Sequence, residues 1–466
     1  MYDGINSVVS FKGQQSTQFT SYIGVRQGEN LSPLLFALYV NDIEEYMLKN
    51  NCVYLNIDND EYICEKLKLL LLLYADDSVI ISDNKTSLQH SLNVLQTYCE
   101  MWKLKVNVKN TKIVIFSKRK KKDVYNFTYD GNQLEIVDHF CYLGVIFSSN
   151  GSTVEHFKKT VTQAQRAAFA LISRAKRLEF PLDTILDLYK SMVLPILLYG
   201  CEAWGCEKLH IIERFQLQFL KCILNLKKST PNVMVYGETG IYPIEILVKC
   251  RLVKYWAKII SPHKKSLTQE LYNVLLYKSS TSNKDFKWLK SVKTVVENTG
   301  FSYVWDTQYV DNVNSFINLL ECNLKDQYIQ SWHETLYNGT MYSNYRMFKQ
   351  SFGSELYLTH MLPSEAIILC RFRTGNSNLA IVRGRYNNVP RPERLCDLCN
   401  TNLGDEYHSL LECTGLIEVR KLLIKPYYCR NPNTLKFSQL MNSKKRKELG
   451  HIVKFIKLIN KKFVQF

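Results

Sequence analysis

The chain has 466 residues, of which 46% are hydrophobic, and it carries 60 Lys and Arg against 43 Asp and Glu. The resulting net charge of +17, with a pI near 9.1, favours binding to nucleic-acid phosphates. Membrane surfaces would also attract this charge, but no apolar run reaches the roughly 20 residues of a spanning helix, and no amino-terminal signal pattern is present. The length indicates about three domains. Fourteen cysteines without secretory context favour an intracellular chain, in the nucleus or the cytoplasm.

A polar loop, Gly24 to Asn30, precedes the first predicted helix. Gly28 permits close approach of a ligand to the backbone, while Arg26 and Gln27 offer donors to phosphates or base edges. Ser32 is a good N-cap and Pro33 suits the first turn. We therefore expect a helix from Ser32 to about Ile43.

Two adjacent carboxylates, Asp76 and Asp77, lie between two apolar runs, Leu69–Leu73 and Val79–Ile81. Two strands joined by a two-residue turn would hold both aspartates clear of a buried sheet. Such a pair can bind Mg²⁺, and paired Mg²⁺ ions can clamp the attacking and leaving oxygens of a phosphoryl transfer. The alternative is an ordinary solvated Asp-Asp turn, which is common.

Four segments in order resemble the core of a known polymerase family. Ile23 to Asn41 and the Tyr74–Asp77 turn are similar to two core motifs of reverse transcriptases of non-LTR (LINE-type) retrotransposons. Tyr98 to Phe116 resembles the next palm motif, and Cys141 to Val145 resembles the primer-grip hairpin. The resemblance covers about the first third of the chain. It fits group II intron maturases and telomerase less well.

The resemblance implies a palm of the right-hand polymerase fold, with an RNA template and a DNA primer as partners. Asp76 and Asp77 would bind Mg²⁺, and Gln27 and Gly28 would line the nascent base pair. The family's third metal-binding aspartate has no counterpart, because Asp3 lies in a segment that resembles sequence downstream of the first catalytic motif. The lysine of the third motif falls on Asn110, so Lys109 or Lys112 could replace it. These departures suggest an amino-terminally truncated copy that lacks endonuclease and fingers.

The sequence after the palm is helical. Apolar residues from Val161 to Leu178 recur at spacings of three and four, with basic residues such as Arg166 and Arg174 around them. A second helix opens at Pro181. The resemblance makes this region the thumb, which grips the primer–template duplex, and Tyr199 to Trp204 is similar to the family's thumb signature. The alternative is an ordinary basic helix with a solvated face.

Two further regions carry weaker signals. Lys118 to Lys122 is a run of five positive charges, expected to be a solvated loop and open to a role as a nuclear localisation signal or phosphate contact. Residues 208–394 show helical spacing without a catalytic constellation, and the polar stretch Ser279 to Lys284 is a candidate domain boundary.

The carboxy-terminal region has a metal-binding pattern. Cys396 and Cys399 form a Cys-x-x-Cys pair, followed after eight residues by His408 and after four more by Cys413. Thiolates and imidazole suit Zn²⁺, and four protein ligands leave no open position, so we expect a structural site. The arrangement resembles the zinc knuckle that follows the polymerase in many of these retroelements.

Several arginines precede this pattern and indicate a nucleic-acid-binding surface: Arg371, Arg373, Arg383, Arg385, Arg391 and Arg394. The expected fold class is α+β, with a partial palm (1–150), a helical thumb (151–240), a helical connector (241–390), a zinc knuckle (391–430) and a basic helical tail (431–466). The function expected is that of a fragment of a LINE-type RNA-directed DNA polymerase, inactive alone. The alternative is a catalytically silent protein that binds RNA or single-stranded DNA. The sequence does not indicate an oligomeric state.

Overall fold

The computed structural model describes residues 4–21, 24–25, 28–53, 55–56, 68–117, 125–204, 209–261, 266–281 and 286–463. Contacts divide the chain into two compact units. Unit 1 comprises Met1–Tyr142 and Ile146–Ser152, and unit 2 comprises Leu143–Val145 and Thr153–Phe466. Each unit has its own hydrophobic core.

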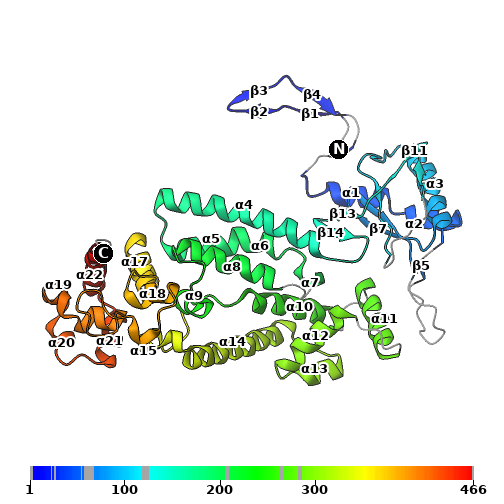
Figure 1. The fold of residues 1–466 in the computed structure, drawn as a ribbon. Helices are drawn as coiled ribbons and strands as arrows, with labels where there is room; N and C mark the ends of the chain where they lie inside the picture. Colours follow the sequence, from blue (N-terminus) through cyan, green and yellow to red (C-terminus); the bar gives the residue numbers. More distant parts are fainter. Residues whose placement is uncertain are drawn as a thin grey trace. The chain divides into compact units, whose positions relative to one another are not determined.

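Within its described residues, unit 1 combines short strands with three helices (Figure 1). Its strands are β1 (Ile5–Ser7), β2 (Ser10–Phe11), β3 (Gln14–Gln15), β4 (Phe19–Ser21), β5 (Leu55–Asn56), β6 (Lys68–Leu69), β7 (Leu71–Tyr74), β8 (Asp77–Ile80), β9 (Lys112–Ile113), β10 (Thr128–Tyr129), β11 (Asn132–Gln133), β12 (Glu135–Ile136), β13 (His139–Tyr142) and β14 (Val145–Ser148). Its helices are α1 (Ser32–Tyr39), α2 (Ile43–Lys49) and α3 (Lys85–Met101). Within the described ranges the strands pair only two by two: β1 with β4, β2 with β3, β5 with β6, β7 with β8, β10 with β11, β13 with β14, and β12 parallel to β9.

The core of unit 1 forms where α2 packs on α3. Met47 of α2 and Tyr98 of α3 are completely buried. The hydroxyl of Tyr98 donates a hydrogen bond to the Asp42 carboxylate at 2.6 Å, which places the residue just before α2 against α3. This contact holds the segment that connects α1 to α2 against α3.

The single helix predicted from Ser32 to Ile43 is therefore wrong in its carboxy-terminal part. The first helix does begin at Ser32, but it ends at Tyr39, and α2 begins at Ile43 after a tight turn. Ser32 is not the N-cap, because Leu31 holds that position and makes no side-chain capping bond. The interruption lets Val40 and Ile43 both reach buried positions.

From Thr153 onward the regular elements of the described part of unit 2 are all helices, and two isolated β-bridges join Thr239 to Ser354 and Leu395 to Leu403. Its first helices are α4 (Val154–Leu178), α5 (Leu182–Leu188), the π-helix η1 (Tyr189–Val193), α6 (Leu194–Leu197), α7 (Cys201–Trp204), α8 (Leu209–Ile223), α9 (Asn232–Thr239), α10 (Ile244–Ile260), α11 (Leu267–Thr281), α12 (Lys287–Asn298), α13 (Ser302–Thr307) and α14 (Val313–Asn338). The later ones are η2 (Thr340–Tyr342), α15 (Tyr345–Phe348), α16 (Tyr357–His360), α17 (Pro363–Arg373), α18 (Ala380–Tyr386), η3 (Arg391–Glu393), η4 (His408–Glu412), η5 (Thr414–Leu416), α19 (Ile417–Leu423), α20 (Pro426–Cys429), α21 (Thr434–Met441) and α22 (Arg446–Phe463).

The amphipathic helix predicted for Val161–Leu178 is confirmed, although α4 begins seven residues earlier. Its buried face includes Ala164, Ala168, Leu171 and Ala175, spaced by three and four residues. This face packs against α5, α6 and α8, which lie along α4 in Figure 1. A second apolar cluster forms where α10 packs against α12 and α14.

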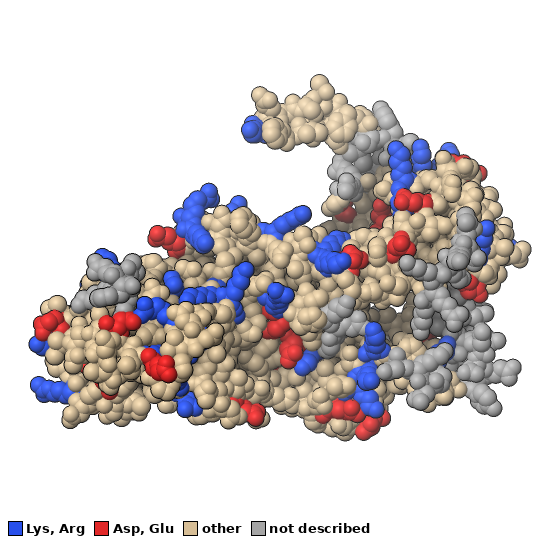
Figure 2. Space-filling view, viewed as in Figure 1, with Lys and Arg blue, Asp and Glu red and all other residues tan. Residues whose placement is uncertain are grey.

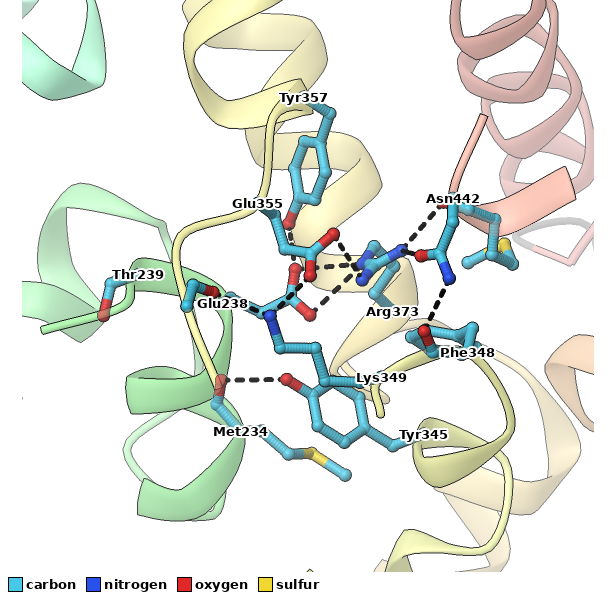
Figure 3. A network of polar contacts seen from close by, with 12 residues as sticks. Met234, Glu238, Thr239, Tyr345, Phe348, Lys349, Glu355, Tyr357, Arg373 and Asn442 are labelled. Carbon is cyan, nitrogen blue, oxygen red and sulfur yellow. Dashed lines mark hydrogen bonds and ion pairs between the residues drawn. The ribbon is translucent and has the colours of Figure 1, made fainter. Parts of the chain in front are cut away.

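A buried polar network ties distant segments of unit 2 together (Figure 3). The Arg373 guanidinium pairs with Glu238 of α9 and with Glu355, each at 2.9 Å, and donates to the Met441 carbonyl at 2.8 Å. Lys349 pairs with Glu355 at 2.5 Å. Arg373 is 2% exposed, so the expectation that it contributes to a nucleic-acid-binding surface is wrong.

No helix within the described ranges is long and apolar enough to cross a membrane.

Candidate functional site

The two aspartates lie at the tip of a β-hairpin. In the β7–β8 pair Leu71 faces Ile80 and Tyr74 faces Asp77, so Ala75 and Asp76 form a two-residue turn. Ala75 has a φ of +51°, the sign that tight hairpin turns of the primed types require at their first central position. The predicted strand–turn–strand is therefore confirmed.

Both carboxylates are accessible to a ligand. Asp76 and Asp77 are exposed, and the chain returns near them at the end of β13. There, burial and secondarily the charge of Asp77 raise the pKa of Tyr142. Within the described ranges, no third acidic, cysteine or histidine side chain joins the aspartates in a metal-binding group. The hairpin tip thus supplies two carboxylates to a cation.

The remaining residues assigned to template and nucleotide contacts are only partly described. Arg26 and Gln27 lie outside the described residues. Gly28 has a φ of +86°, and a Cβ there would meet no atom within 4 Å, which leaves its backbone open to a partner. Lys112 on β9 is bound to Glu135 of β12 at 2.6 Å, so a phosphate would have to compete with this carboxylate.

The four predicted metal ligands of the carboxy-terminal region lie together. One atom of each of Cys396, Cys399, His408 and Cys413 falls within 4.8 Å of the others. The sulfurs of Cys396 and Cys413 are 3.7 Å apart, and the Cys399 sulfur is 3.2 Å from Nε2 of His408. With Zn–S bonds of about 2.3 Å, two sulfurs of a tetrahedron lie about 3.8 Å apart. The geometry therefore suits a small tetrahedral cation.

Backbone contacts hold these ligands in place. The Cys396 amide donates to the Asn402 carbonyl at 2.8 Å, which closes the turn that carries the first two cysteines. The Asp405 carboxylate accepts from the His408 amide at 2.8 Å and orients the start of η4. A Cβ on Gly404 would lie 2.9 Å from the Cys396 Cα, so the close approach of the two segments depends on this glycine.

The charges of the cluster also favour a cation. Burial opposes ionisation of Cys399, but hydrogen bonds from Thr401 and from the backbone outweigh it and lower the pKa of this thiol to about 6. A hydrogen bond with Cys396 raises the pKa of His408 to about 9. The His408 Nδ1 lies 3.5 Å from the Glu412 carboxylate, a second-shell partner typical of zinc-bound histidines. A proton on the imidazole thus occupies the place that a metal would take.

The arginines predicted to contact nucleic acid differ in their exposure and in whether they are already paired with a carboxylate. Arg166 and Arg174 are exposed on α4, where Phe169 between them is 75% exposed. Figure 2 shows Lys and Arg side chains gathered along this edge of unit 2. Arg383 is ion-paired with Asp397, and Arg385 is half-buried. The α4 face is therefore the more accessible of the two surfaces.

Positive charge is concentrated in one part of the sequence. Residues 153–466 contain 45 of the 60 Lys and Arg but only 26 of the 43 Asp and Glu. Residues 1–152 contain slightly more acidic than basic residues. The net charge of the whole chain hides this asymmetry, which is visible in the sequence when charges are counted by segment.

Comparisons with known proteins support the resemblance to reverse transcriptases in the first third of the chain. Residues 2–147 match the family model described as reverse transcriptase (RNA-dependent DNA polymerase). The RNA-directed DNA polymerase from mobile element jockey of Drosophila melanogaster is 24% identical over 208 residues, 42% of this chain and 21% of the relative. The probable RNA-directed DNA polymerase from transposon BS of the same species is 26% identical over 251 residues, 52% of this chain and 26% of the relative.

A further relative is matched over a longer segment. The Pol polyprotein from the type-1 retrotransposable element R2 of Popillia japonica is 21% identical over 304 residues, 58% of this chain and 46% of the relative. The chain spans about a quarter of the length of the jockey and BS relatives.

Proposed function

Because the chain carries a reverse transcriptase domain of the LINE type, we propose that it is a polymerase fragment that binds RNA or single-stranded DNA but does not copy a template alone. The exposed pair Asp76 and Asp77, at a hairpin tip inside the matched segment, carries this proposal. Two Mg²⁺ ions held there would activate the primer 3′ hydroxyl and neutralise the incoming triphosphate.

The expected lack of synthesis follows from the number of carboxylates. Asp76 lies in the two-residue turn and Asp77 is the first residue of β8, so a single hairpin tip supplies both carboxylates. The polymerase family completes the site with a third carboxylate from a neighbouring strand, and within the described residues no third acidic group joins Asp76 and Asp77. With two protein ligands the cation is bound weakly, and the negative charge that develops in the transition state is not stabilised.

We assign the remaining regions by their place after this domain. The proposed division is palm for 1–150, thumb for 151–240, connector for 241–390, zinc knuckle for 391–430 and basic tail for 431–466. Unit 2 continues from Thr153 with α4 as its first helix, which supports a thumb that follows the palm directly.

The thumb would contact nucleic acid through the outer face of α4. Arg166 and Arg174 there are exposed and can neutralise phosphates. Phe169, exposed between them, can stack on an unpaired base. Arg383 and Arg385 form a second proposed contact near the cysteine cluster, which we propose binds one structural Zn²⁺.

A primer-extension assay with the 466-residue chain tests the proposal. We expect no templated product with Mg²⁺, while a labelled single-stranded RNA is bound in the same buffer. Magnesium-dependent extension that Asp76→Ala abolishes would contradict the inactivity and would mean that another residue completes the site. A chain that binds no RNA would contradict the binding role, and with it the alternative of a catalytically silent binding protein.

A further inference from the structure

A small open pocket lies in unit 2 between α17 and α22. Its cavity volume is about 70 Å³, well below the roughly 300–1,000 Å³ of sites for drug-sized ligands. The loop after α17 forms one wall with Ser377 and Asn378, α17 contributes Arg371, and α22 contributes Asn460. A group of the size of one phosphate fits such a pocket, whereas a duplex does not.

The loop that forms the wall is held rigidly. Asn376 is 4% exposed, and its side-chain oxygen accepts hydrogen bonds from the Lys227 amide at 3.0 Å and the Thr230 hydroxyl at 2.8 Å. The Asn376 amide donates to the Arg371 carbonyl at 2.7 Å, across a turn that places Gly375 at a φ of +65°. The next residue, Ser377, is thereby fixed at the pocket wall.

Two donors of the pocket have no partner within the described ranges. Ser377 is 7% exposed, yet its Oγ makes no hydrogen bond. A buried hydroxyl without a partner is unfavourable and uncommon in folded proteins. Arg371 is half-buried, and no described group forms a hydrogen bond or an ion pair with its guanidinium. The buried Ser377 hydroxyl, which has no partner, and the half-buried Arg371 guanidinium, which solvent can reach, therefore belong to the same small pocket.

The polar side chains that line the pocket favour binding of an anion. No carboxylate lines the pocket, and its polar groups are a guanidinium, a hydroxyl and amides. Lys457 and Lys461, each adjacent in sequence to a pocket residue of α22, are exposed. A guanidinium fork and a hydroxyl match the oxygens of phosphate.

We propose that this pocket binds a phosphate group, with Arg371 neutralising the charge and Ser377 donating its hydroxyl proton to a phosphate oxygen. The phosphate comes either from a nucleic-acid strand or from a free phosphate ion. The first source depends on the nucleic-acid binding proposed above, but the pocket itself does not.

Thermal unfolding of the full chain in inorganic phosphate tests the pocket independently of nucleic acid. We expect phosphate to raise the unfolding midpoint above that in sodium chloride of equal ionic strength, because a ligand of the folded state stabilises it. Ser377→Ala and Arg371→Gln should each weaken the phosphate affinity roughly tenfold or more, as loss of a hydrogen bond to a charged group does. Ser377→Ala removes an unpaired buried hydroxyl and should not impair folding.

Arg430→Gln is the matched control, because Arg430 is exposed and does not line the pocket. It removes one positive charge and should leave the phosphate effect unchanged. A wild-type midpoint that does not respond to phosphate beyond ionic strength would overturn the proposal. A response that persists in both pocket variants would overturn it as well.

The source of the phosphate is resolved with single-stranded RNA of one sequence, with and without a 5′ phosphate. Tighter binding of the 5′-phosphorylated strand that Ser377→Ala abolishes supports a terminal phosphate. Equal binding of both strands that Ser377→Ala weakens supports an internal phosphodiester. RNA affinity that is the same in wild type and both pocket variants, beside a pocket-dependent phosphate effect, supports free phosphate. None of these results depends on polymerase activity.

Discussion

At the scale of single residues, Arg373 is a charged side chain that is buried and depends on nearby carboxylates. Its charge and that of Lys349 are balanced by two carboxylates, Glu238 and Glu355, and the side chain of Arg373 is completely buried. The Tyr357 hydroxyl donates a further hydrogen bond to Glu238 at 2.5 Å. The group is neutral as a whole, which makes burial of four charges tolerable.

Replacing Arg373 by alanine should therefore destabilise unit 2 strongly. The substitution leaves Glu238 buried without its cation, and loss of one partner of a buried ion pair costs about 3–5 kcal/mol. Urea unfolding followed by circular dichroism measures the change. Lys421→Ala is the control, because its pair with Glu418 is exposed and contributes at most about 1 kcal/mol. Equal unfolding midpoints for the two variants would contradict this account.

The sequence did not reveal this role of Arg373. Its neighbours in sequence include several other arginines, and such a group is typical of a basic surface. Its carboxylate partner Glu238 lies 135 positions away, so no local pattern could connect the two. The clustering of the four proposed metal ligands could be predicted, because Cys396 to Cys413 lie within one short segment.

At the scale of elements, the cysteine cluster should fix the segment from α18 to η5. A metal bound by the four side chains would add its binding free energy to the stability of this short segment, and its removal would leave the buried Cys396 and Cys413 without a cation between them. We expect native mass spectrometry to find one Zn²⁺ per chain, and chelation to lower the thermal midpoint.

Cys399→Ser should abolish zinc uptake, whereas Cys429→Ser should retain it. Cys429 is half-buried and lies outside the cluster, which makes it a matched control for loss of a thiol. A chain that takes up no zinc, or that melts at the same temperature with and without chelator, would remove the metal from the proposed function.

The outer face of α4 makes a second prediction at this scale. Arg166→Gln with Arg174→Gln should weaken binding of single-stranded RNA and reduce the slope of log affinity against log salt by about 1.4, roughly 0.7 for each phosphate contact. Fluorescence anisotropy at several salt concentrations measures both quantities.

Lys158→Gln provides the control on the same helix. Lys158 is exposed but already paired with Glu155 at 2.7 Å, so its removal should change the slope much less. An unchanged slope in the arginine double variant would mean that these residues form only a solvated face.

The elements that the sequence predicted well have strong local signals. The spacing of apolar residues in α4 and the two apolar runs on either side of Asp76 and Asp77 each involve only neighbouring residues. The break between α1 and α2 was missed, because it depends on the contact of Asp42 with Tyr98, 56 positions away. Residues 208–394 gave only a general helical signal, and their helices, among them α10 and α14, are arranged by contacts between segments far apart in the sequence.

At the scale of the whole molecule, the two units differ in charge. The net charge of +17 comes entirely from residues 153–466, because residues 1–152 have slightly more acidic than basic residues. Association with a polyanion should therefore depend on unit 2, while the Asp76–Asp77 hairpin belongs to unit 1.

A chain of residues 143–466 should fold alone and keep most of the affinity for single-stranded RNA. It contains unit 2 with both of its hydrophobic clusters, including completely buried side chains such as Trp256 and Phe455. It also retains the excess of positive charge that drives counterion release. Circular dichroism should show a cooperative thermal transition, and anisotropy should give a salt slope close to that of the 466-residue chain. A soluble, folded 143–466 chain with a much smaller slope would show that unit 1 supplies contacts that its net charge does not indicate.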